Sequence, residues 1–563
     1  MEYTGAQILL ESLKREGVDL LFGYPGAAVL NIYDELPNYP EIRHILVRHE
    51  QCAVHAADGY ARASGKAGVC LVTSGPGATN TVTGIATAYC DSIPLVVVTG
   101  QVPTHLIGND AFQEVDIVGI TRPCTKHNFF VEDVNKLSMI IRRAFYLARS
   151  GRPGPVLVDL PKDIVQTKTK FVWPEEIGMR SYNPTYKPHG NQLRRTVAEL
   201  FRARRPVLLA GGGVIMSGAA TDLANLARKL QLPVVATLMG LGSFPATDPL
   251  WLGMVGIHGT YAANMSINHA DLLLCVGTRF ADRVTAKISA FAPRARIVHI
   301  DIDPTSIRKN VQVDVPVVGD CRLSLQGIQE ICDLTLAGKD WVAKHADWLV
   351  SAQNWKKSTP PTCQKNGEVK PQQVVEALFG ITGGDAVIAT EVGQHQMWTA
   401  QFYAFTRPRT LLTSGGLGAM GYGFPAAIGA QLAFPNKKVI VVAGDGSIQM
   451  NIQELATAVA NRLPVKVIIL NNRHLGLVRQ LQELFHHGKY IASNMEAQPD
   501  FVKLAEAYGA EGYRITKPEE LQPVLQKAIA SPATALVDVV VERTENVYPI
   551  VPTGAALDEM LLM

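Results

Sequence analysis

The sequence of 563 residues has no closely paired cysteines, no long hydrophobic run and no excess of charge of one sign. None of its eight cysteines belongs to a CxxC motif, which argues against a disulfide framework or a thiolate metal site. No stretch of about 18 uninterrupted apolar residues and no basic, apolar leader is present. The net charge of +3 lacks the basic excess typical of nucleic-acid binding. We therefore expect a cytoplasmic protein that binds neither nucleic acid nor membrane.

Short β-branched runs alternate with helix-like segments along the whole chain. Continuous apolar strands in this alternation are typical of parallel sheets covered by helices on both faces. The runs are 68–72, 94–100, 155–160, 205–213, 271–277, 296–303, 386–390, 438–446 and 465–472. We predict an α/β fold of three domains, each with a doubly wound, mainly parallel sheet flanked by helices.

Two polar, proline-containing stretches interrupt this alternation, at 166–190 and 337–372, and are interpreted as linkers. The predicted domains are 1–165, 190–336 and 371–563.

The strongest chemical signal is the pair of motifs GDGS and NN, each placed directly after a predicted strand. Asp445 and Asn472 would offer a carboxylate and a carboxamide oxygen to a Mg²⁺ ion that also needs phosphate oxygens. Gly444 and Gly446 let the backbone approach a diphosphate, and a helix expected to begin at Ser447 would direct its amides at the same charge. A lone GDG is more often a simple turn, but both strand contexts together favour a cofactor site.

This pattern resembles that of the thiamine-diphosphate enzymes. The resemblance implies that Asp445 and Asn472 bind the metal together with the backbone carbonyl of His474. It implies a second diphosphate loop at 391–398 and a segment at 413–423 around the cofactor rings. The cofactor-binding residues implied are Val392, Gly393, Gln394, His395, Gly418, Met420, Gly444, Gly446, Ser447, Leu475, Gly476, Leu477 and Val478. Met420 would be the bulky apolar residue that bends the cofactor.

The same resemblance assigns the activating carboxyl group to Glu50, which would hydrogen-bond the pyrimidine ring and relay a proton. Without the family, Glu50 is better interpreted as a solvated helix end. The loop TSGPGATN at 73–80 resembles another first-domain element of the family, although alone it is as often a connector. Family members bind the cofactor between the first domain of one subunit and the third of another. A homodimer or homotetramer is therefore implied.

Further segments resemble the catalytic subunits of acetohydroxyacid synthases from end to end. They include GYPGAAV (23–29), GNDAFQEVD (108–116), RFADRV (279–284) and VYPIVPTGA (547–555). The resemblance implies decarboxylation of pyruvate and addition of the hydroxyethyl carbanion to a second pyruvate or to 2-ketobutyrate. The products would be 2-acetolactate and 2-aceto-2-hydroxybutyrate, precursors of branched-chain amino acids. The resemblance also implies a separate regulatory small subunit.

The middle domain resembles the branch of this family that contains FAD. The glycine triplet at 211–213 alone would be a weak signal, but similar segments follow it in the family's order. The implied flavin contacts are Arg152, Gly211, Gly212, Gly213, Thr237, Leu238, Met239, His258, Gly277, Arg279, Arg283, Asp301, Ile302 and Asp320. Because the net reaction has no redox step, this flavin would be structural. Ala281 replaces a family Asp beside it.

Substrate contacts are also implied. Arg283 matches the arginine that recognises the second substrate's carboxylate, a role suited to a forked guanidinium, although a domain-interface ion pair is the alternative. Phe112 and Gln113 match residues that reach the site from the neighbouring subunit, and Phe112 would otherwise be a core residue. Gly26 and Ala27 would present a backbone N–H to a developing oxyanion. Leu481 replaces the usual Trp, so we expect weaker preference for 2-ketobutyrate and tolerance of herbicides.

The sequence is also compatible with other functions. Within the class, the alternatives are a flavin-free catabolic acetolactate synthase, a pyruvate oxidase or another carboligase. A nicotinamide-dependent dehydrogenase is disfavoured because no GxGxxG opens a βαβ unit with an acidic residue about 20 residues later. A noncatalytic scaffold is disfavoured by the complete set of Glu50, Asp445 and Asn472.

Overall fold

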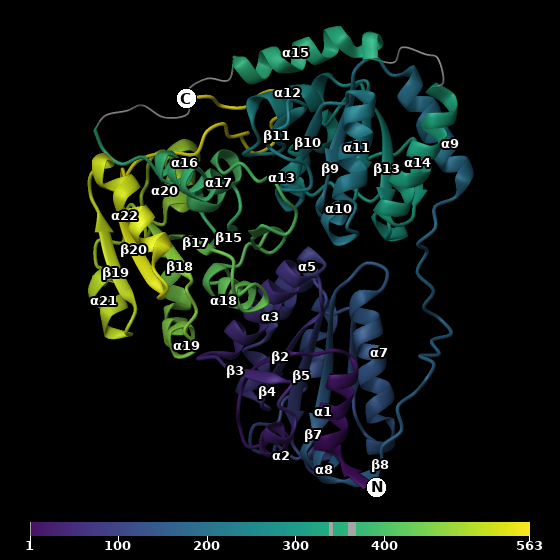
Figure 1. Cartoon of the computed structure of the whole chain (residues 1–563), viewed down its shortest axis with the longest axis vertical. Coiled ribbons are helices and arrows are strands. Elements are labelled where there is room, and N and C mark those ends of the chain that lie inside the picture. The colour runs from purple at the N-terminus through teal and green to yellow at the C-terminus, as the bar shows by residue number, and fades with distance from the viewer. Residues whose placement is uncertain (1, 337–341, 359–366) are drawn as a thin grey trace.

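The structure is a computed structural model that describes residues 2–336, 342–358 and 367–563 (Figure 1). Three six-stranded parallel sheets follow one another along the chain, which confirms the predicted α/β class. In Figure 1 the first unit is purple and blue, the central unit is teal, and the third is green to yellow. The seven cysteines within the described residues are free, and Cys363 lies outside them.

The first and third sheets have the same strand order. Numbered within each unit, that order is 2-1-3-4-6-5 in both. The first sheet contains β2 (Leu20–Tyr24), β3 (Arg43–Leu46), β4 (Gly68–Val72), β5 (Leu95–Gln101), β6 (His127–Phe130) and β7 (Pro155–Pro161). The third contains β15 (Val387–Thr390), β16 (Leu411–Leu412), β17 (Val439–Gly444), β18 (Lys466–Asn471), β19 (Glu511–Ile515) and β20 (Ala535–Val540).

The central sheet differs, because its order is 3-2-1-4-5-6, the arrangement typical of dinucleotide-binding folds. Its strands are β9 (Pro206–Ala210), β10 (Val234–Ala236), β11 (Trp251–Met254), β12 (Leu272–Val276), β13 (Arg296–Asp301) and β14 (Val315–Val318). A short antiparallel pair, β1 (Glu2–Thr4) with β8 (Lys168–Lys170), closes the first unit.

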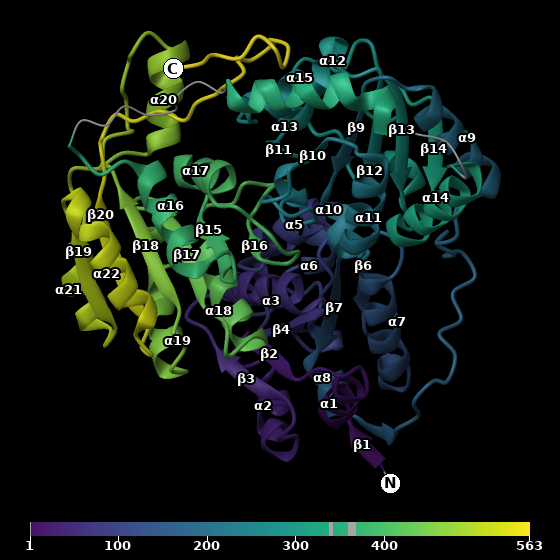
Figure 2. The same cartoon turned by 45° about the horizontal axis from the view of Figure 1, so that its top comes forward.

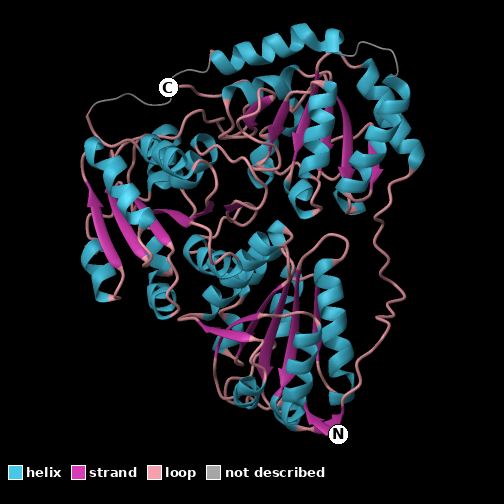
Figure 3. Ribbon diagram, in the orientation of Figure 1, coloured by secondary structure: helices cyan, strands magenta, loops and turns pink. Residues whose placement is uncertain are grey.

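Helices cover both faces of the sheets (Figure 3). Those of the first two units include α1 (Gly5–Arg15), α3 (Glu50–Ser64), α5 (Val82–Asp91), α7 (Leu137–Arg149), α9 (Gly190–Arg202), α11 (Ala220–Leu230), α12 (Tyr261–His269) and α14 (Cys321–Leu336). The third unit includes α16 (Pro371–Thr382), α17 (Gln394–Phe402), α18 (Gly423–Ala433), α20 (Gly476–Phe485), α21 (Phe501–Ala507) and α22 (Pro518–Ala530). Within the described chain, no helix combines the length and the apolar composition needed to span a bilayer.

Helix α3 shows how the sequence fixes an element that later carries the site. His49 caps its N-terminus by accepting a hydrogen bond from the N–H of Gln51, and Gly65 ends it in a left-handed conformation. Its alanine-rich body is buried against α18. A Cβ on Gly59 would lie 2.0 Å from the Ala426 carbonyl oxygen. This close approach, which only glycine permits, packs the first unit onto the third.

The stretch 337–372, interpreted as a linker, contains helix α15 (Ala346–Lys357) in its described part. This helix lies over the central unit at the top of Figures 1 and 2. Trp348 is buried, and its indole N–H donates to the carbonyl of Pro206 at 3.0 Å. Trp348 and Ala352 are buried in the central unit's core, and Lys356 donates to the carbonyl of Trp251 at 2.8 Å. The first linker is extended after β8 and leads to α9.

Candidate active site

The candidate residues lie near the switch point of each sheet, where successive strands begin to be added on the opposite side. Open α/β folds bind their ligands at this point. In the third sheet this point lies between β15 and β17. His395 follows β15, and Gly444 ends β17. A Cβ on Gly444 would lie 2.9 Å from Nδ1 of His395. The glycine thus leaves room for the loop after the neighbouring strand.

Asp445 and Asn472 follow β17 and β18, which are paired neighbours. Both side chains are buried, and neither carboxylate oxygen of Asp445 has a hydrogen-bond partner. The Oδ1 of Asn472 accepts the N–H of His474 at 3.0 Å. A buried carboxylate without a partner is costly, and bound Mg²⁺ would supply the missing charge. The oxygen donors present therefore fit a hard divalent cation.

The electrostatics of this pocket suit an anionic cofactor held by a metal. Desolvation raises the pKa of Asp445 to about 7. The nearby N–H groups of Asn472 and Arg473 oppose this rise, but neither makes a hydrogen bond to the carboxylate. Desolvation lowers the pKa of His395 to about 3, so its ring is neutral. Its buried Nε2 has no partner in the protein. This orphaned nitrogen marks a polar position that a bound cofactor would fill.

Gln394 links the loop after β15 to Asn472 and to α20. Its Oε1 accepts from Nδ2 of Asn472 at 3.4 Å, and its Nε2 donates to Oε1 of Gln480 at 2.9 Å. A Cβ on Gly476 would lie 2.0 Å from the same Oε1. The side chain of Gln394 therefore orients Asn472 and supports the start of α20.

The segment after Ser447 differs from the expected helix. It forms two 3₁₀ turns, η9 (Ile448–Met450) and η10 (Ile452–Glu454), before α19 (Leu455–Ala460). Asn451 separates them with a non-helical backbone, and its Nδ2 donates to the carbonyl of Gly421 at 2.5 Å. The Ser447 hydroxyl instead bonds both the N–H and the carbonyl of Gly444 at 3.2 Å. Continuing the helix would break the contact with Gly421.

The segment predicted to surround the cofactor rings lies beside the predicted diphosphate loop. Gly418 has a left-handed φ of +72°, and the nearest atom to a Cβ there would be Cγ1 of Val392, at 3.9 Å. Glu391, which the sequence interpretation did not assign, accepts the N–H groups of Gly421 and Phe424 at 2.6 and 3.1 Å. Glu391 directly follows a predicted strand and opens the segment EVGQHQMW, and this position could have marked it as a site residue.

Burial raises the pKa of Glu391 to about 7, above its usual 4.5. The folded protein therefore holds this proton more tightly than the unfolded chain. The resulting stabilisation is complete below pH 4.5 and is lost as pH rises through 7. Relative to Glu391→Gln, we expect the wild type to lose about 3 kcal/mol of stability between pH 4.5 and 8. Thermal midpoints of both proteins across this range measure the difference, and parallel pH profiles would contradict the assignment.

The first unit's candidates also meet at a switch point, between β2 and β4. Glu50 is the first residue of α3, half-buried, and its Oε2 accepts from Nδ2 of Asn80 at 2.9 Å. A Cβ on Gly77 would lie 3.4 Å from its Oε1. The loop 73–80 therefore lies against Glu50. Asn80 is a contact that the sequence interpretation did not assign.

Other residues of the first unit approach the same loop. A Cβ on Gly26 would lie 2.5 Å from Cβ of Thr73, and Ala27 beside it is exposed. A Cβ on Gly75 would lie 2.8 Å from Cβ of Gln113. The neighbouring Phe112 is not a core residue, because 87% of its surface is exposed. An aromatic side chain this exposed is available to a second chain.

A cavity of about 720 Å³ is lined by residues of all three units. Its wall includes most of the predicted flavin contacts: Arg152, Gly212, Gly213, Thr237, Leu238, Met239, His258, Gly277, Arg279, Arg283, Asp301, Ile302 and Asp320. Gly211 packs beneath this wall, where its Cβ would lie 2.1 Å from the Gly277 carbonyl oxygen. These glycines follow β9 and β12, at the central sheet's switch point. The cradle fits a dinucleotide such as FAD.

The same cavity wall includes Val392 and Gly418 from the third unit, with Leu477 and Leu481 from α20. Arg283 reaches it with a side chain that is 77% exposed and lies 3.8 Å from a carboxylate oxygen of Asp282. The cavity therefore joins the predicted flavin, thiamine and substrate residues. The described residues that line this cavity do not include Glu50, Gly26, Ala27 or Gln113.

The fold and these sites define a thiamine-diphosphate enzyme. Models of the N-terminal TPP binding domain, the central domain and the C-terminal TPP binding domain of thiamine pyrophosphate enzymes match residues 3–120, 193–328 and 391–539.

Relatives narrow this class. The chain is 50% identical to the acetolactate synthase isozyme 3 large subunit of Escherichia coli K12, over 99% of this chain and 98% of the relative. It is 48% identical to the acetolactate synthase large subunit of Haemophilus influenzae, with the same coverage. It is 46% identical to the acetolactate synthase of Mycobacterium bovis, over 99% of this chain and 91% of the relative. The chain belongs to the acetolactate synthase large-subunit family, which confirms the resemblance found in the sequence.

Proposed function

We propose that the chain is an acetohydroxyacid synthase that acts in branched-chain amino acid biosynthesis in the cytoplasm. It would join the two-carbon unit left by decarboxylation of pyruvate to a second pyruvate or to 2-ketobutyrate. The observation that supports this proposal is the shared cavity, because Arg283, Leu481, Val392 and Gly418 all line it.

Thiamine diphosphate, when bound, supplies the carbon nucleophile that decarboxylation and carbon–carbon bond formation require. Asp445, Asn472 and the carbonyl of His474 would hold Mg²⁺. The unpartnered carboxylate of Asp445 and the unpartnered Nε2 of His395 support this site. Val392, Gly393 and the glycines of the GDG motif would admit the diphosphate.

Glu50 would move the activating proton, and Gly26 and Ala27 would offer a backbone N–H to the oxygen of the reacting carbonyl group. Arg283 would bind the carboxylate of the second 2-keto acid. Because Glu50 lies outside the cavity wall and Phe112 is exposed, we propose a homodimer or homotetramer in which Phe112 and Gln113 enter the site of a neighbouring copy. The term "large subunit" in the names of the relatives supports a separate small regulatory subunit for this chain.

FAD is proposed as a structural cofactor in the central cradle, with the central domain spanning 190–336 between domains at 1–165 and 371–563. The dinucleotide-type strand order and the glycine contacts between Gly211 and Gly277 support it.

The test is a product assay with purified protein, Mg²⁺, thiamine diphosphate and FAD, with pyruvate alone or with 2-ketobutyrate, in the absence of oxygen. We expect 2-acetolactate from pyruvate and both acetohydroxy acids from the mixture. With Leu481 in the pocket, the preference for 2-ketobutyrate should be weak, because losing a large apolar face removes about 1–3 kcal/mol of discrimination. A strong preference would contradict this role for Leu481.

Other outcomes identify the alternatives. Release of CO₂ without either acetohydroxy acid would indicate a decarboxylase. Peroxide formation in a parallel aerobic assay would indicate an oxidase. Full synthase activity in protein that binds no flavin would indicate the catabolic type.

A further inference from the structure

The loop Gly415–Gly421, which carries Gly418 and Met420, needs an external restraint to hold one shape. Four of its seven residues are glycines, and Gly418 and Gly421 have positive φ angles of 72° and 86°. Glycine-rich backbone loses more conformational entropy on ordering than any other. The loop also forms part of the cavity wall. Its shape must therefore be fixed by contacts with its surroundings.

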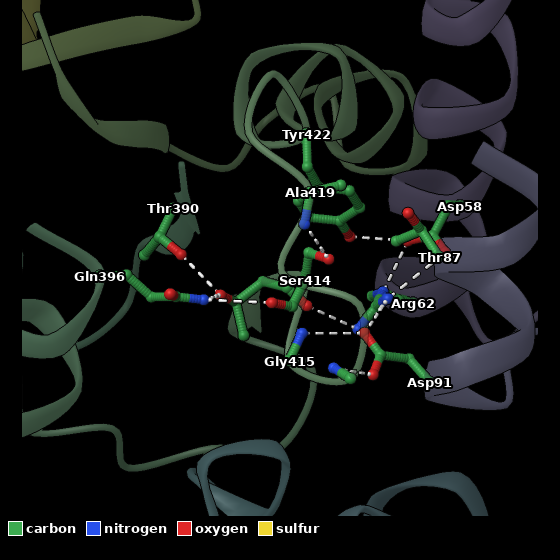
Figure 4. Close-up of polar contacts among 12 residues, drawn as sticks. Asp58, Arg62, Thr87, Asp91, Thr390, Gln396, Ser414, Gly415, Ala419 and Tyr422 are labelled. Carbon is green, nitrogen blue, oxygen red and sulfur yellow. Dashed lines mark hydrogen bonds and ion pairs between the residues drawn. The ribbon is translucent and has the colours of Figure 1, made fainter. Parts of the chain in front are cut away.

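Asp91, the last residue of α5, fixes the beginning of this loop. Its Oδ1 accepts the N–H of Gly416 at 2.7 Å, and its Oδ2 accepts the N–H of Gly415 at 3.1 Å. The carboxylate is fully buried and belongs to the first unit, more than 300 residues away in sequence. Figure 4 shows Asp91 pointing at Gly415 from the helix on which it lies.

Arg62 on α3 forms an ion pair with Asp91 and holds its carboxylate in place. Its Nη2 lies 2.8 Å from Oδ2 of Asp91, and its Nε lies 2.6 Å from Oδ1 of Asp58. Its Nη1 donates to the carbonyl of Thr413 at 2.9 Å, just before the loop. The hydroxyl of Tyr422, just after the loop, donates to Oδ1 of Asp58 at 2.6 Å. One buried ionic cluster therefore contacts the chain on both sides of the loop (Figure 4).

Glu391 restrains the other end of the loop from within the third unit, through the N–H groups of Gly421 and Phe424. Between these anchors, the N–H of Ala419 donates to the hydroxyl of Ser414 at 3.0 Å. Hydrogen bonds to charged acceptors are about twice as strong as neutral ones, so the carboxylate of Asp91, paired with Arg62, supplies the strongest of these contacts, and Glu391 adds two further acceptors.

We propose that Asp91, held by Arg62, and Glu391 are positioning residues that clamp the loop Gly415–Gly421 in the shape that receives thiamine diphosphate. This inference rests on the proposed function, because the loop is assigned to the cofactor rings. It goes further by giving the first unit a role in shaping the cofactor pocket of its own chain.

The test compares the wild type with Asp91→Asn, in which the amide keeps one acceptor oxygen and loses the charge. Binding of thiamine diphosphate is measured by titration calorimetry with Mg²⁺ and without substrate. Hydrogen exchange of the segment 413–424 is followed in the cofactor-free protein. We expect at least about 10-fold weaker cofactor binding, as for loss of a charge-assisted hydrogen bond. We also expect faster exchange confined to this segment.

Asp19→Asn is the matched control, because Asp19 also pairs with a basic residue, Lys66, and bonds a tyrosine of α3, yet lies away from the loop. It should change neither measurement. Wild-type affinity together with wild-type exchange in Asp91→Asn would overturn the proposal. If that variant does not fold, Glu391→Gln is measured in the same way, and unchanged values there would overturn it equally. Both measurements omit substrate, so their outcome is separate from whether the enzyme forms acetolactate.

Discussion

Glu50→Gln is expected to lower kcat by about 10²-fold to 10⁴-fold, the range for removing a positioned acid–base group. The amide oxygen can still accept the hydrogen bond from Asn80, so the start of α3 and the loop 73–80 should keep their shape. Cofactor affinity should therefore change much less than kcat. Steady-state kinetics at saturating pyruvate, with calorimetry of cofactor binding, separates the two effects.

Glu41→Gln is the control for this experiment. Glu41 lies in the same unit and pairs with Lys14 at the surface, so its loss should leave kcat unchanged. If Glu50→Gln keeps full activity, the proton relay assigned to Glu50 is wrong. If it instead loses cofactor binding with an unchanged kcat at saturation, Glu50 is only a binding contact.

Asp445→Asn is expected to abolish Mg²⁺-dependent cofactor binding, with a loss of at least about 100-fold in affinity. The same substitution should stabilise the cofactor-free protein. Because both carboxylate oxygens are buried without partners, replacing the charge should raise stability at pH 8 by about 1–3 kcal/mol. Thermal midpoints with and without Mg²⁺ and thiamine diphosphate measure both effects.

Asp385→Asn provides the comparison for Asp445→Asn, since this third-unit carboxylate is exposed and pairs with Arg407 and Lys437. Its stability and cofactor binding should resemble those of the wild type. A destabilised Asp445→Asn that still binds cofactor would place the metal elsewhere.

The sheet architecture was predictable because buried parallel strands leave a local signal. The β-branched runs at 68–72, 271–277 and 438–446 all form central strands. The stretch that contains α15 was interpreted as a linker, yet the seven-residue spacing of Trp348 and Trp355 indicates one helical face, and their rings meet 5.6 Å apart on this helix. Trp341, the first tryptophan of this repeat, lies outside the described residues. The helix expected after Ser447 begins there only as two 3₁₀ turns before α19, and Asn451, whose side chain bonds to Gly421, interrupts them. A tertiary contact decided that backbone.

Side chains at strand ends were equally accessible to prediction. Asp445 and Asn472 follow adjacent strands, so their proximity follows from the order of the motifs. Asp91 and Glu391 were not assigned because their partners in the loop are backbone N–H groups. Every residue except proline carries such a group, so the sequence does not mark these partners. Asp91 meets Gly415 across more than 300 residues of sequence, and no local pattern encodes that pairing.

The matching strand orders of the first and third sheets bear on the ancestry of this chain. An order of 2-1-3-4-6-5 is one of many possible for six parallel strands, and two independent origins would rarely arrive at it within one polypeptide. Duplication of one ancestral gene explains both units at once. The two units would then have diverged in the residues at their strand ends: Glu50 follows the second strand of the first unit, and Asp445 and Asn472 follow the third and fourth strands of the third unit. The different strand order of the central unit shows no sign of the same duplication.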